Sequence, residues 1–581
     1  MFRLNLFKKD NTALIIFSFF ILSFFYVFFY MKNGVILVGS DRMFHLERME
    51  EAYQTLLNGH LISYISTYSF ARVGQAINIF YPSLNLVIFA LIHLFIKSNI
   101  LSFYMYIYLE QWIGLTIAYY SGRVILRSTK SAYLFALTLR FSTYVLYNDF
   151  ARCDIGESWA LLFVPMVFAG FYLLLKENSM RGSLILALGL ILELYCHILT
   201  TLLTVVFIMV CYICYYLFIK KNIRTIFLLF NAGIIFILGS LCITVPIISM
   251  MASVKINKPN INTLDAYNLT FSGLISNSIN NNLEMDSPNI GLILVITLIL
   301  GFIGYQKRSK LMRHIYLLSV ILTIMTVNLF PWSIFSKTPV SIIQFPWRLF
   351  IIIIVLLSLY FADFAGKNFS FGQCIIFTTL ILAITISSQM RFNLAQNAHY
   401  QTLQTQKEAI NGWGYLLDDK ATFKIKSRNL ISSLSSRSLD YLPEKAIKNN
   451  ENIFEHKVLI DSKKIDLKNN QIISGYQNIS YNLSELSNGR KIQLPFLAYS
   501  KNYYRVYRNN KQVPFTLSSS STIQISKVKN SKNTLIKVQF ITPILWKIAN
   551  IISFVVLLLL LVVLIMSVKL NSKFRKGSMV N

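Results

Sequence analysis

Cysteine and acidic residues are scarce in this sequence. Its six cysteines lie almost entirely within apolar runs, and the long polar region near the C-terminus has none, which argues against a disulfide framework or a zinc site. The 25 Asp and Glu residues are outnumbered by 55 Lys and Arg residues, which cluster in short segments between apolar runs and in a Lys/Asn-rich tail. Anionic lipid and the positive-inside rule explain this pattern, so no nucleic-acid partner is expected.

Charged residues of either sign make up only 14% of the 581 residues, whereas 55% are hydrophobic. Many apolar runs are about 18 residues or longer, which is enough to cross ~30 Å of hydrocarbon. The sequence therefore predicts a mainly α, polytopic transmembrane helical bundle. The first run lacks a small-residue cleavage pattern, so we expect it to be retained as a span rather than removed as a signal peptide.

We expect about twelve spans. Along the chain, the connections between them alternate between basic segments and segments with few basic residues. The predicted spans are 12–31, 101–120, 131–147, 158–175, 182–197, 200–219, 224–248, 289–306, 314–332, 346–364, 371–388 and 549–568. The positive-inside rule places the basic connections and both chain ends in the cytoplasm. The apolar run 81–97 is short and is interrupted by His93, so it is expected to be a juxtamembrane or re-entrant helix on the outer side.

Three domains are predicted from these changes in composition. Residues 1–390 form the transmembrane domain, with an external first loop over 32–100. Residues 391–545 form an extracytoplasmic domain with a helical start, followed by alternating polar and apolar segments that predict an antiparallel β-sandwich. Residues 546–581 form the last span and a basic cytoplasmic tail.

The stretch SDRMFHLERMEEAYQTLLNGH follows the first span, and Asp41 lies about ten residues beyond that span. Apolar residues recur in it at helical spacing, which predicts an amphipathic helix lying in the membrane interface. On one interpretation, Asp41 or Ser40 merely caps a solvated helix. The acidic residues of the helix are expected to face water: Glu47, Glu50 and Glu51.

The second loop, YNDFARCDIGESWA, places Asp149, Arg152, Asp154 and Glu157 between two spans. An acidic cluster beside membrane helices is costly unless it is solvated, paired or used. A wet loop with an ion pair to Arg152 is the simpler alternative to a functional site.

A third element, SIIQFPWRLFIII, marks where the chain re-enters the membrane from outside. Trp347 suits the interfacial belt, and Arg348 can either reach upward as an anchor or hold an anion such as a lipid phosphate. Gln344 precedes them by one turn.

Three further ionisable residues lie in or beside the spans. His197 falls at an outer turn, where a histidine by itself is more often packed or capping. Glu110 and Arg140 each lie about nine residues into a span and are expected to form a structural pair.

Five motifs occur in order before the β-rich tail: SDRMFHLERM, GQAINIFYPSL, YNDFARCDIGESWALLFVP, QFPWRLF and SLDYLP. In this order they resemble the bacterial integral membrane proteins described as 6-pyruvoyl-tetrahydropterin synthase-related, which look like members of the GT-C glycosyltransferase superfamily. The resemblance runs over most of the chain and is strongest in residues 39–165 and 341–350.

The resemblance implies a catalytic acid in each of the first two external loops and a sugar donor linked to polyprenyl phosphate or diphosphate. By position, Asp41 is the first acid, and Glu157 or Asp154 is the second. Family members usually have an apolar or small residue at the positions of Cys153 and Asp154, which favours Glu157. Asp41 would be the base for the acceptor hydroxyl, and Arg348 would hold the departing phosphate. The other candidate cations are Arg42, Arg48 and Arg152.

The predicted substrate-binding residues are Arg348, His45, Arg48, Tyr81, Arg152, His197, Gln344 and Trp347. Asp41 and Glu157 from two loops would also suit Mg²⁺ or Mn²⁺, although two carboxylates do not prove a metal.

The expected activity is that of an inverting membrane glycosyltransferase on the outer face of a bacterial cell membrane. It would transfer a sugar from a polyprenyl-phosphate donor to a cell-envelope glycan or glycolipid. The alternatives are a transporter or flippase of a lipid-linked glycan and a non-catalytic envelope assembly protein. A transporter would place ionisable groups along a path near the bilayer midplane.

Overall fold

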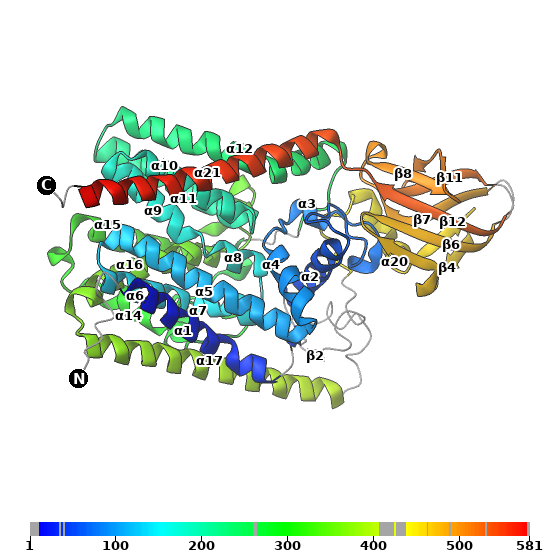
Figure 1. Ribbon diagram of the computed structural model, residues 1–581. Coiled ribbons are helices and arrows are strands. Elements are labelled where there is room, and N and C mark those ends of the chain that lie inside the picture. Colours follow the sequence, from blue (N-terminus) through cyan, green and yellow to red (C-terminus); the bar gives the residue numbers. More distant parts are fainter. Residues whose placement is uncertain are drawn as a thin grey trace.

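The computed structural model shows a long helical bundle joined at one end to a β-sandwich (Figure 1). Helix α1 begins and helix α21 ends at the opposite end of the bundle (Figure 1). The structure describes residues 11–33, 36–38, 41–259, 264–405, 423–425, 437–461, 463–486, 490–528 and 531–577.

The helices of the bundle follow the apolar runs of the sequence. The longer ones are α1 (Thr12–Asn33), α5 (Asn99–Leu126), α6 (Thr129–Arg140), α9 (Val164–Glu177), α10 (Met180–Leu194), α11 (Ile198–Phe218), α12 (Ile223–Ser253), α15 (Lys310–Thr326), α16 (Phe350–Asn368), α17 (Phe371–Thr405) and α21 (Ile544–Gly577). The shorter ones are α2 (Arg42–Leu57), α3 (Ile77–Phe80), α4 (Leu86–Ile96), α7 (Thr143–Leu146), α8 (Ile155–Ala160), α13 (Phe271–Asn280), α14 (Leu292–Leu300) and α20 (Asn450–Phe454).

Within the described residues, seven helical stretches are long and apolar enough to cross a membrane. They are Thr12–Lys32, Ile155–Glu177, Ile198–Phe218, Ile223–Ser253, Pro346–Asn368, Phe371–Ala395 and Ile544–Ser567. Each coincides with a predicted span, so the prediction of a membrane-spanning helical bundle is confirmed at this level. The number of twelve is not confirmed, and the assignment of the two membrane sides stays a prediction.

The other five predicted spans contain helices that are shorter or less apolar. Helix α5 has the length, but Glu110 and Gln111 lie in its middle. The predicted span 289–306 contains only the nine residues of α14. This helix begins after Gly291, whose φ of +86° and ψ of 164° leave the helical region and suit glycine. It ends at Gly301, a residue with no side chain to favour continuation.

The predicted span 131–147 is also broken. Helix α6 ends at Arg140, and the chain resumes as α7 and then as a π-helical turn, η2 (Tyr147–Ala151). Ser142 has extended backbone angles, which interrupts the helical hydrogen bonding between the two pieces. The short run 81–97 contains α4, whose 11 residues rise about 16 Å and are too short to cross ~30 Å of hydrocarbon.

The polar C-terminal region contains two five-stranded antiparallel sheets, with strand orders β10-β11-β7-β3-β4 and β5-β6-β12-β8-β9. Residues two apart point the same way, so Ile536 and Val538 of β12 both face inward and are fully buried. Val538 pairs with Ile479 on one side and Val506 on the other. The predicted β-rich domain is therefore confirmed, while its limits and those of the other domains stay predictions.

The strand bounds are β3 (Lys457–Ile460), β4 (Lys463–Asp466), β5 (Ile472–Gly475), β6 (Asn478–Leu486), β7 (Arg490–Leu497), β8 (Tyr504–Arg508), β9 (Lys511–Val513), β10 (Thr516–Leu517), β11 (Thr522–Val528) and β12 (Ser531–Phe540). Two further strands, β1 (Ile36–Val38) and β2 (Phe423–Ile425), pair antiparallel with each other. The predicted helical start of the external domain is observed as the end of α17, up to Thr405; its continuation over 406–410 lies outside the described residues.

The first external loop and the β-sandwich share one hydrophobic core. Tyr64, Ile65 and Val73 of the loop belong to the same buried cluster as the inward residues of both sheets. The Val73 carbonyl accepts a hydrogen bond from the Leu497 amide of β7 at 2.8 Å. Helices α2 and α3 therefore lie between the bundle and the sandwich (Figure 1), and the shared core holds the sandwich against the segment that contains them.

Candidate functional site

Arg152 is the centre of a buried charged cluster. It directly follows the π-helical turn η2, and its amide closes that turn by donating to the Tyr147 carbonyl at 2.8 Å. Cys153 then adopts a left-handed φ of +59°, which turns the chain before Asp154 caps helix α8 by accepting from the Glu157 amide at 3.1 Å. This local geometry brings Arg152, Asp154 and Glu157 together.

Each nitrogen of the Arg152 guanidinium faces a different carboxylate. Nε lies 3.1 Å from Asp41 Oδ2, Nη2 lies 2.8 Å from Asp154 Oδ2, and Nη1 lies 3.0 Å from Glu157 Oε2. The Asp41 amide also donates to the Arg152 carbonyl at 3.1 Å. The first two external loops, which the sequence proposes as the sources of two catalytic acids, thus meet at one guanidinium.

Glu157 is saturated with partners. Its Oε1 accepts from Asn148 Nδ2 at 3.3 Å and from the Tyr144 hydroxyl, while its Oε2 faces Arg152 and lies 3.4 Å from Arg348 Nε. The side chain is fully buried. A carboxylate held in this way is well placed to orient two arginines, but it has no oxygen free to take up a proton from a substrate.

Asp154 is also enclosed. Its Oδ1 accepts from the Tyr81 hydroxyl at 2.5 Å and lies 3.4 Å from His45 Nε2, in addition to capping α8. Burial opposes its ionisation, but Arg152 outweighs burial and holds the pKa of Asp154 well below its usual range. It is therefore a fixed negative charge.

Asp41 differs from the other two acids because it is open. Its side chain keeps 43% of its surface exposed, and its Oδ1 has no hydrogen-bond partner among the described residues. It occupies the N-cap position of α2, but its carboxylate makes no capping hydrogen bond, so Asp41 does not cap the helix through its side chain. Ser40, the other predicted cap, lies outside the described residues. Loss of solvent around the carboxylate raises the pKa of Asp41 to about 6, although the charge of Arg152 opposes this shift.

His45 and Arg48 support the cluster from helix α2. His45 Nδ1 lies 3.1 Å from Arg48 Nη1 and must accept there, because arginine only donates. The His45 proton is then on Nε2, facing Asp154. Burial lowers the pKa of His45 to about 4, so the ring is neutral at pH 7.

Arg48 and Tyr81 form a second layer. The Arg48 guanidinium lies 4.1 Å from the centre of the Tyr81 ring and donates to the Pro82 carbonyl at 2.5 Å. On the other side, the Tyr81 ring lies 5.5 Å from the ring of His197, which caps α11 by accepting from the Thr200 amide at 3.4 Å. His197 thus takes the capping role that the sequence left open for it, while its predicted role in substrate binding stays a prediction.

The third element closes the cluster from the start of helix α16. Arg348 lies in the turn η7 (Pro346–Leu349), where Gln344 Oε1 and the Ile343 carbonyl accept from its Nη1. Trp347 lies under Arg152, with 5.3 Å between its ring centre and the guanidinium carbon. The eleven residues predicted as catalytic or substrate-binding therefore belong to one connected cluster, while their catalytic and binding roles stay predictions. Of the other candidates, Arg42 donates to the Phe150 carbonyl, and Asp149 accepts from the hydroxyls of Tyr26 and Ser158.

The acidic residues of α2 do not face water, and α2 is not a helix exposed at an interface. Glu51 is fully buried and accepts from the backbone amides of Thr67, Tyr68 and Ser69 at 2.9 to 3.2 Å. Glu47 is 1% exposed and accepts from the amide of Phe70. The loop needs these acceptors because its backbone N–H groups are buried there and would otherwise be left without a partner. Glu50, at 8%, is buried against Gln54.

Two partners of the cluster were not predicted. Tyr144 and Asn148 hold Glu157, and both lie on the α7–η2 segment. With Arg152 they recur every four residues, a spacing that places side chains on one face of a helix. That periodicity is visible in YVLYNDFAR and is the signal that places Tyr144 and Asn148 beside Arg152.

The cluster does not have the form of a metal site. Within the described part of the chain, no three His, Cys, Asp or Glu side chains gather where they could hold an ion. Asp41 and Glu157, the two acids considered for Mg²⁺ or Mn²⁺, both bond to the Arg152 guanidinium, which lies between them. A cation would have to replace that guanidinium, so the residues as placed do not fit a metal.

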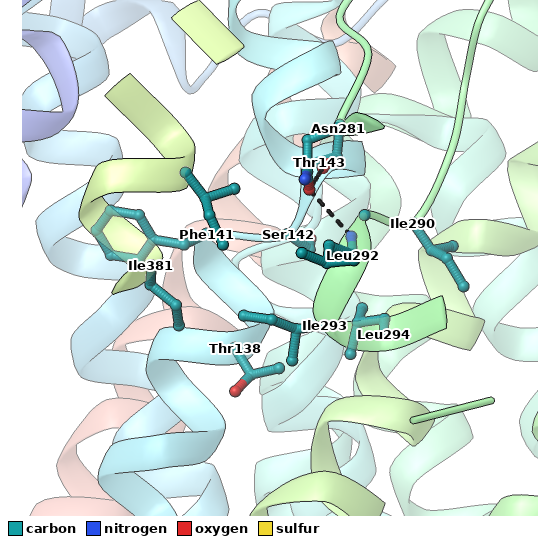
Figure 2. A pocket seen from close by; sticks show the side chains of 12 residues that line it. Thr138, Phe141, Ser142, Thr143, Asn281, Ile290, Leu292, Ile293, Leu294 and Ile381 are labelled. Atoms are coloured by element: carbon teal, nitrogen blue, oxygen red, sulfur yellow. Dashed lines mark hydrogen bonds between the residues drawn. The ribbon is translucent and has the colours of Figure 1, made fainter. Parts of the chain in front are cut away.

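Two other polar features lie away from the cluster. A pocket between α6, α14 and α17 is lined by apolar side chains and by Thr138, Ser142, Thr143 and Asn281, with Asn281 bonded to Thr143 and to the Leu292 amide (Figure 2). Its lining contains no acid, base or histidine, so it cannot supply acid–base chemistry. In the bundle interior, Arg140 Nη2 lies 3.3 Å from Glu110 Oε1, which confirms the expected pair.

Comparisons with known proteins give limited similarity. No protein-family model matches the chain, so the resemblance to the 6-pyruvoyl-tetrahydropterin synthase-related proteins stays a prediction. An uncharacterised protein of Lactococcus lactis subsp. cremoris (strain MG1363) is 26% identical over 227 residues, which are 38% of this chain. The chain thus spans 36% of that relative's length.

Two solved structures that show some similarity to this chain are glycosyltransferases. One is the arabinofuranosyltransferase AftD from Mycobacteria, with a TM-score of 0.44 and 14% identity over 65% of this chain and 26% of AftD. The other is ArnT from Cupriavidus metallidurans bound to undecaprenyl phosphate, with a TM-score of 0.34 and 14% identity over 64% of this chain and 63% of ArnT. TM-scores this low do not establish a shared fold or activity.

Proposed function

We propose that the charged cluster is the active site of a membrane glycosyltransferase that uses a polyprenyl-phosphate-linked sugar. The observation that carries the proposal is the contrast between Asp41 and the other two acids. Asp154 and Glu157 are buried and fully bonded, whereas Asp41 keeps one oxygen free and 43% of its side chain exposed. A base must reach its substrate, and Asp41 is the acid that can do so.

In the proposed step, the Asp41 carboxylate accepts the proton of an acceptor hydroxyl. The hydroxyl oxygen forms a bond to the anomeric carbon of the donor sugar. The bond from that carbon to the phosphate oxygen breaks, and its electron pair leaves with the polyprenyl phosphate. A single displacement of this kind inverts the anomeric centre. The acid–base contribution of a positioned carboxylate is typically 10²- to 10⁴-fold.

The rest of the cluster would hold charge in place for this step. Arg48, Arg152 and Arg348 are all at most 6% exposed and are fixed by carboxylates, carbonyls or an aromatic ring. Preorganised cations of this kind stabilise negative charge that develops on a leaving phosphate without reorganising at the moment of reaction. Arg348 is our candidate for the phosphate contact because it lies where α16 enters the predicted membrane.

The same proposal places the protein in a bacterial cell membrane as a multi-pass protein with both chain ends cytoplasmic. The acceptor would be a cell-envelope glycan or glycolipid on the outer face. Helix α2, which carries His45 and Arg48 of the cluster, lies at the end of the bundle next to the β-sandwich, and the first turn of α1 and last turn of α21 lie at the other end (Figure 1). This arrangement supports a site on the side opposite to the termini.

The test is complementation of a deletion strain, with envelope monosaccharide composition as the measurement. Asp41→Asn removes the base while keeping the shape and is expected to lower the rate of glycan accumulation about 100-fold or more. The matched control is Glu50→Gln, another carboxylate on α2, whose partner Gln54 lies outside the cluster. Glu157→Gln is expected to lower the rate through the loss of a fixed position for Arg152 and Arg348.

The proposal requires that the variants reach the membrane in equal amounts, which immunoblotting of membrane fractions measures. A strain carrying Asp41→Asn that accumulates the glycan at the wild-type rate would contradict an enzymatic role for the cluster. That result would instead suit a flippase or an assembly protein, neither of which needs a base.

A further inference from the structure

The motif SLDYLP, residues 438–443, has no role in the proposed reaction so far. It lies in the external segment before the β-sandwich, far along the chain from the loops that build the cluster. Its tyrosine, Tyr441, has a φ of +62°. A bulky residue in the left-handed region is uncommon and strained, so it persists only where the surroundings hold it.

Tyr441 is held from several directions. Its amide donates to the Asn257 carbonyl at 2.9 Å, and its carbonyl accepts from the Tyr499 hydroxyl at 3.0 Å. Gln75 of the first external loop donates to the carbonyl of the preceding residue, Asp440, at 2.7 Å. Contacts from the first loop, from the segment after α12 and from the sandwich therefore fix this backbone conformation.

The conformation aims the Tyr441 ring at the candidate site. The ring stacks on Phe80 with centres 5.2 Å apart and planes 5° from parallel. Phe80 directly precedes Tyr81, which bonds to Asp154. Burial and the charge of Asp440 raise the pKa of Tyr441, whereas the charges of Arg48 and Arg348 oppose the shift. That hydroxyl has no hydrogen-bond partner among the described residues.

We infer that Tyr441 contacts the acceptor glycan through a hydrogen bond between its hydroxyl and a sugar hydroxyl, so that the external domain completes the active site. This inference rests on the proposed function. A phenol hydroxyl can donate and accept, which matches a polyhydroxylated ligand. The acceptor would arrive from outside the membrane, and Tyr441 belongs to the segment predicted to be external, whereas Arg348 at the start of α16 is the residue proposed to hold the donor phosphate.

The test separates the hydroxyl from the ring and the acceptor from the donor. Tyr441→Phe removes only the hydroxyl and keeps the stacking on Phe80. Tyr441→Asn removes the ring but tolerates the left-handed backbone. The control is Tyr507→Phe on β8, a half-buried tyrosine of the sandwich. Each variant is measured for the rate of glycan accumulation in the complemented strain, for binding of decaprenyl phosphate to the purified protein, and for its melting temperature.

We expect Tyr441→Phe to slow glycan accumulation roughly tenfold, as for the loss of one hydrogen bond, and Tyr441→Asn to slow it at least as much. Decaprenyl phosphate binding and melting temperature should stay at the wild-type values for Tyr441→Phe, and Tyr507→Phe should change nothing. Wild-type accumulation with Tyr441→Phe would overturn the inference. Loss of decaprenyl phosphate binding would also overturn it, because the hydroxyl would then serve the donor phosphate.

The two proposals fail in different ways. If Asp41→Asn stops accumulation and Tyr441→Phe does not slow it, only the inference about Tyr441 falls. If Asp41→Asn accumulates the glycan normally, the proposed function falls, and the role of Tyr441 in it falls as well.

Discussion

Replacing Arg152 by Gln is the most revealing structural perturbation of this protein, because one guanidinium joins three carboxylates. Glutamine is shorter and uncharged, so it cannot face Asp41, Asp154 and Glu157 at once. Asp154 and Glu157 would remain buried, with side chains 4% and 0% exposed. Glu157 would keep only Arg348 as a cationic partner, at 3.4 Å.

The expected loss of stability follows from these exposures. Removing one partner of a buried ion pair typically costs about 3–5 kcal/mol, because an unpaired charge is left out of water. The Asp41 contact adds at most about 1 kcal/mol, since 43% of that side chain is exposed and solvent screens it. We therefore expect Arg152→Gln to lower the free energy of unfolding by about 3–5 kcal/mol, nearly all of it through Asp154 and Glu157.

Denaturant titration of the detergent-purified protein, followed by tryptophan fluorescence, measures this difference. The control is Arg127→Gln, which breaks an ion pair with Glu177 whose side chains are 61% and 46% exposed and should cost about 0–1 kcal/mol. Arg152→Lys should recover little, because one ammonium cannot replace a three-sided fork. Equal free energies of unfolding for Arg152→Gln and Arg127→Gln would refute the description of Arg152 as the centre of a buried cluster.

Three further outcomes are expected. The glycosyl-transfer rate should fall about tenfold per pH unit below about pH 6, because the pKa of Asp41 is raised to about 6 and only the ionised carboxylate accepts a proton. Initial rates in membrane vesicles across about pH 5 to 8 measure this. An inflection of the pH–rate profile near 4 would contradict it. Arg140→Met should lower the free energy of unfolding by about 3–5 kcal/mol, because Glu110 is left buried without a cation. Adding Glu110→Gln should restore much of that free energy in the same denaturant titration. An Arg140→Met protein as stable as wild type would contradict the pair. Gly291→Ala should cost about 1–3 kcal/mol, because its φ of +86° is strained for alanine and the new Cβ would lie 2.5 Å from Thr143 Oγ1; Gly372→Ala, with open space around it, is the control.

The sequence predicted the composition of the cluster better than its internal arrangement. Asp41, Glu157 and Arg348 are predicted on one side of the membrane because Asp41 follows a predicted span, Glu157 directly precedes one, and Arg348 lies at the start of one. Which carboxylate stays open depends on contacts across hundreds of residues. Glu157 is saturated by Tyr144, Asn148, Arg152 and Arg348, and no local pattern in IGESWA indicates that.

The error about α2 has a related cause. When only its own sequence is considered, a helix that carries Glu47 and Glu51 on one face is predicted to be exposed to water. Those acids are buried because the loop around residues 66–72 turns its amides toward them, and that loop is held in turn by the β-sandwich. The sequence did not predict the break after Arg140, because hydropathy does not distinguish one long helix from a helix followed by a short helix and a π-helical turn.

The most direct test of the central claim is to locate where the protein binds a polyprenyl phosphate. A photoreactive decaprenyl phosphate, irradiated with the purified protein and mapped by peptide mass spectrometry, should label the segments around the cluster, residues 41–48, 77–82 and 344–350. Unlabelled decaprenyl phosphate should suppress that labelling. Labelling that avoids these segments while remaining suppressible would contradict the assignment of the Asp41–Arg152–Arg348 cluster as the active site.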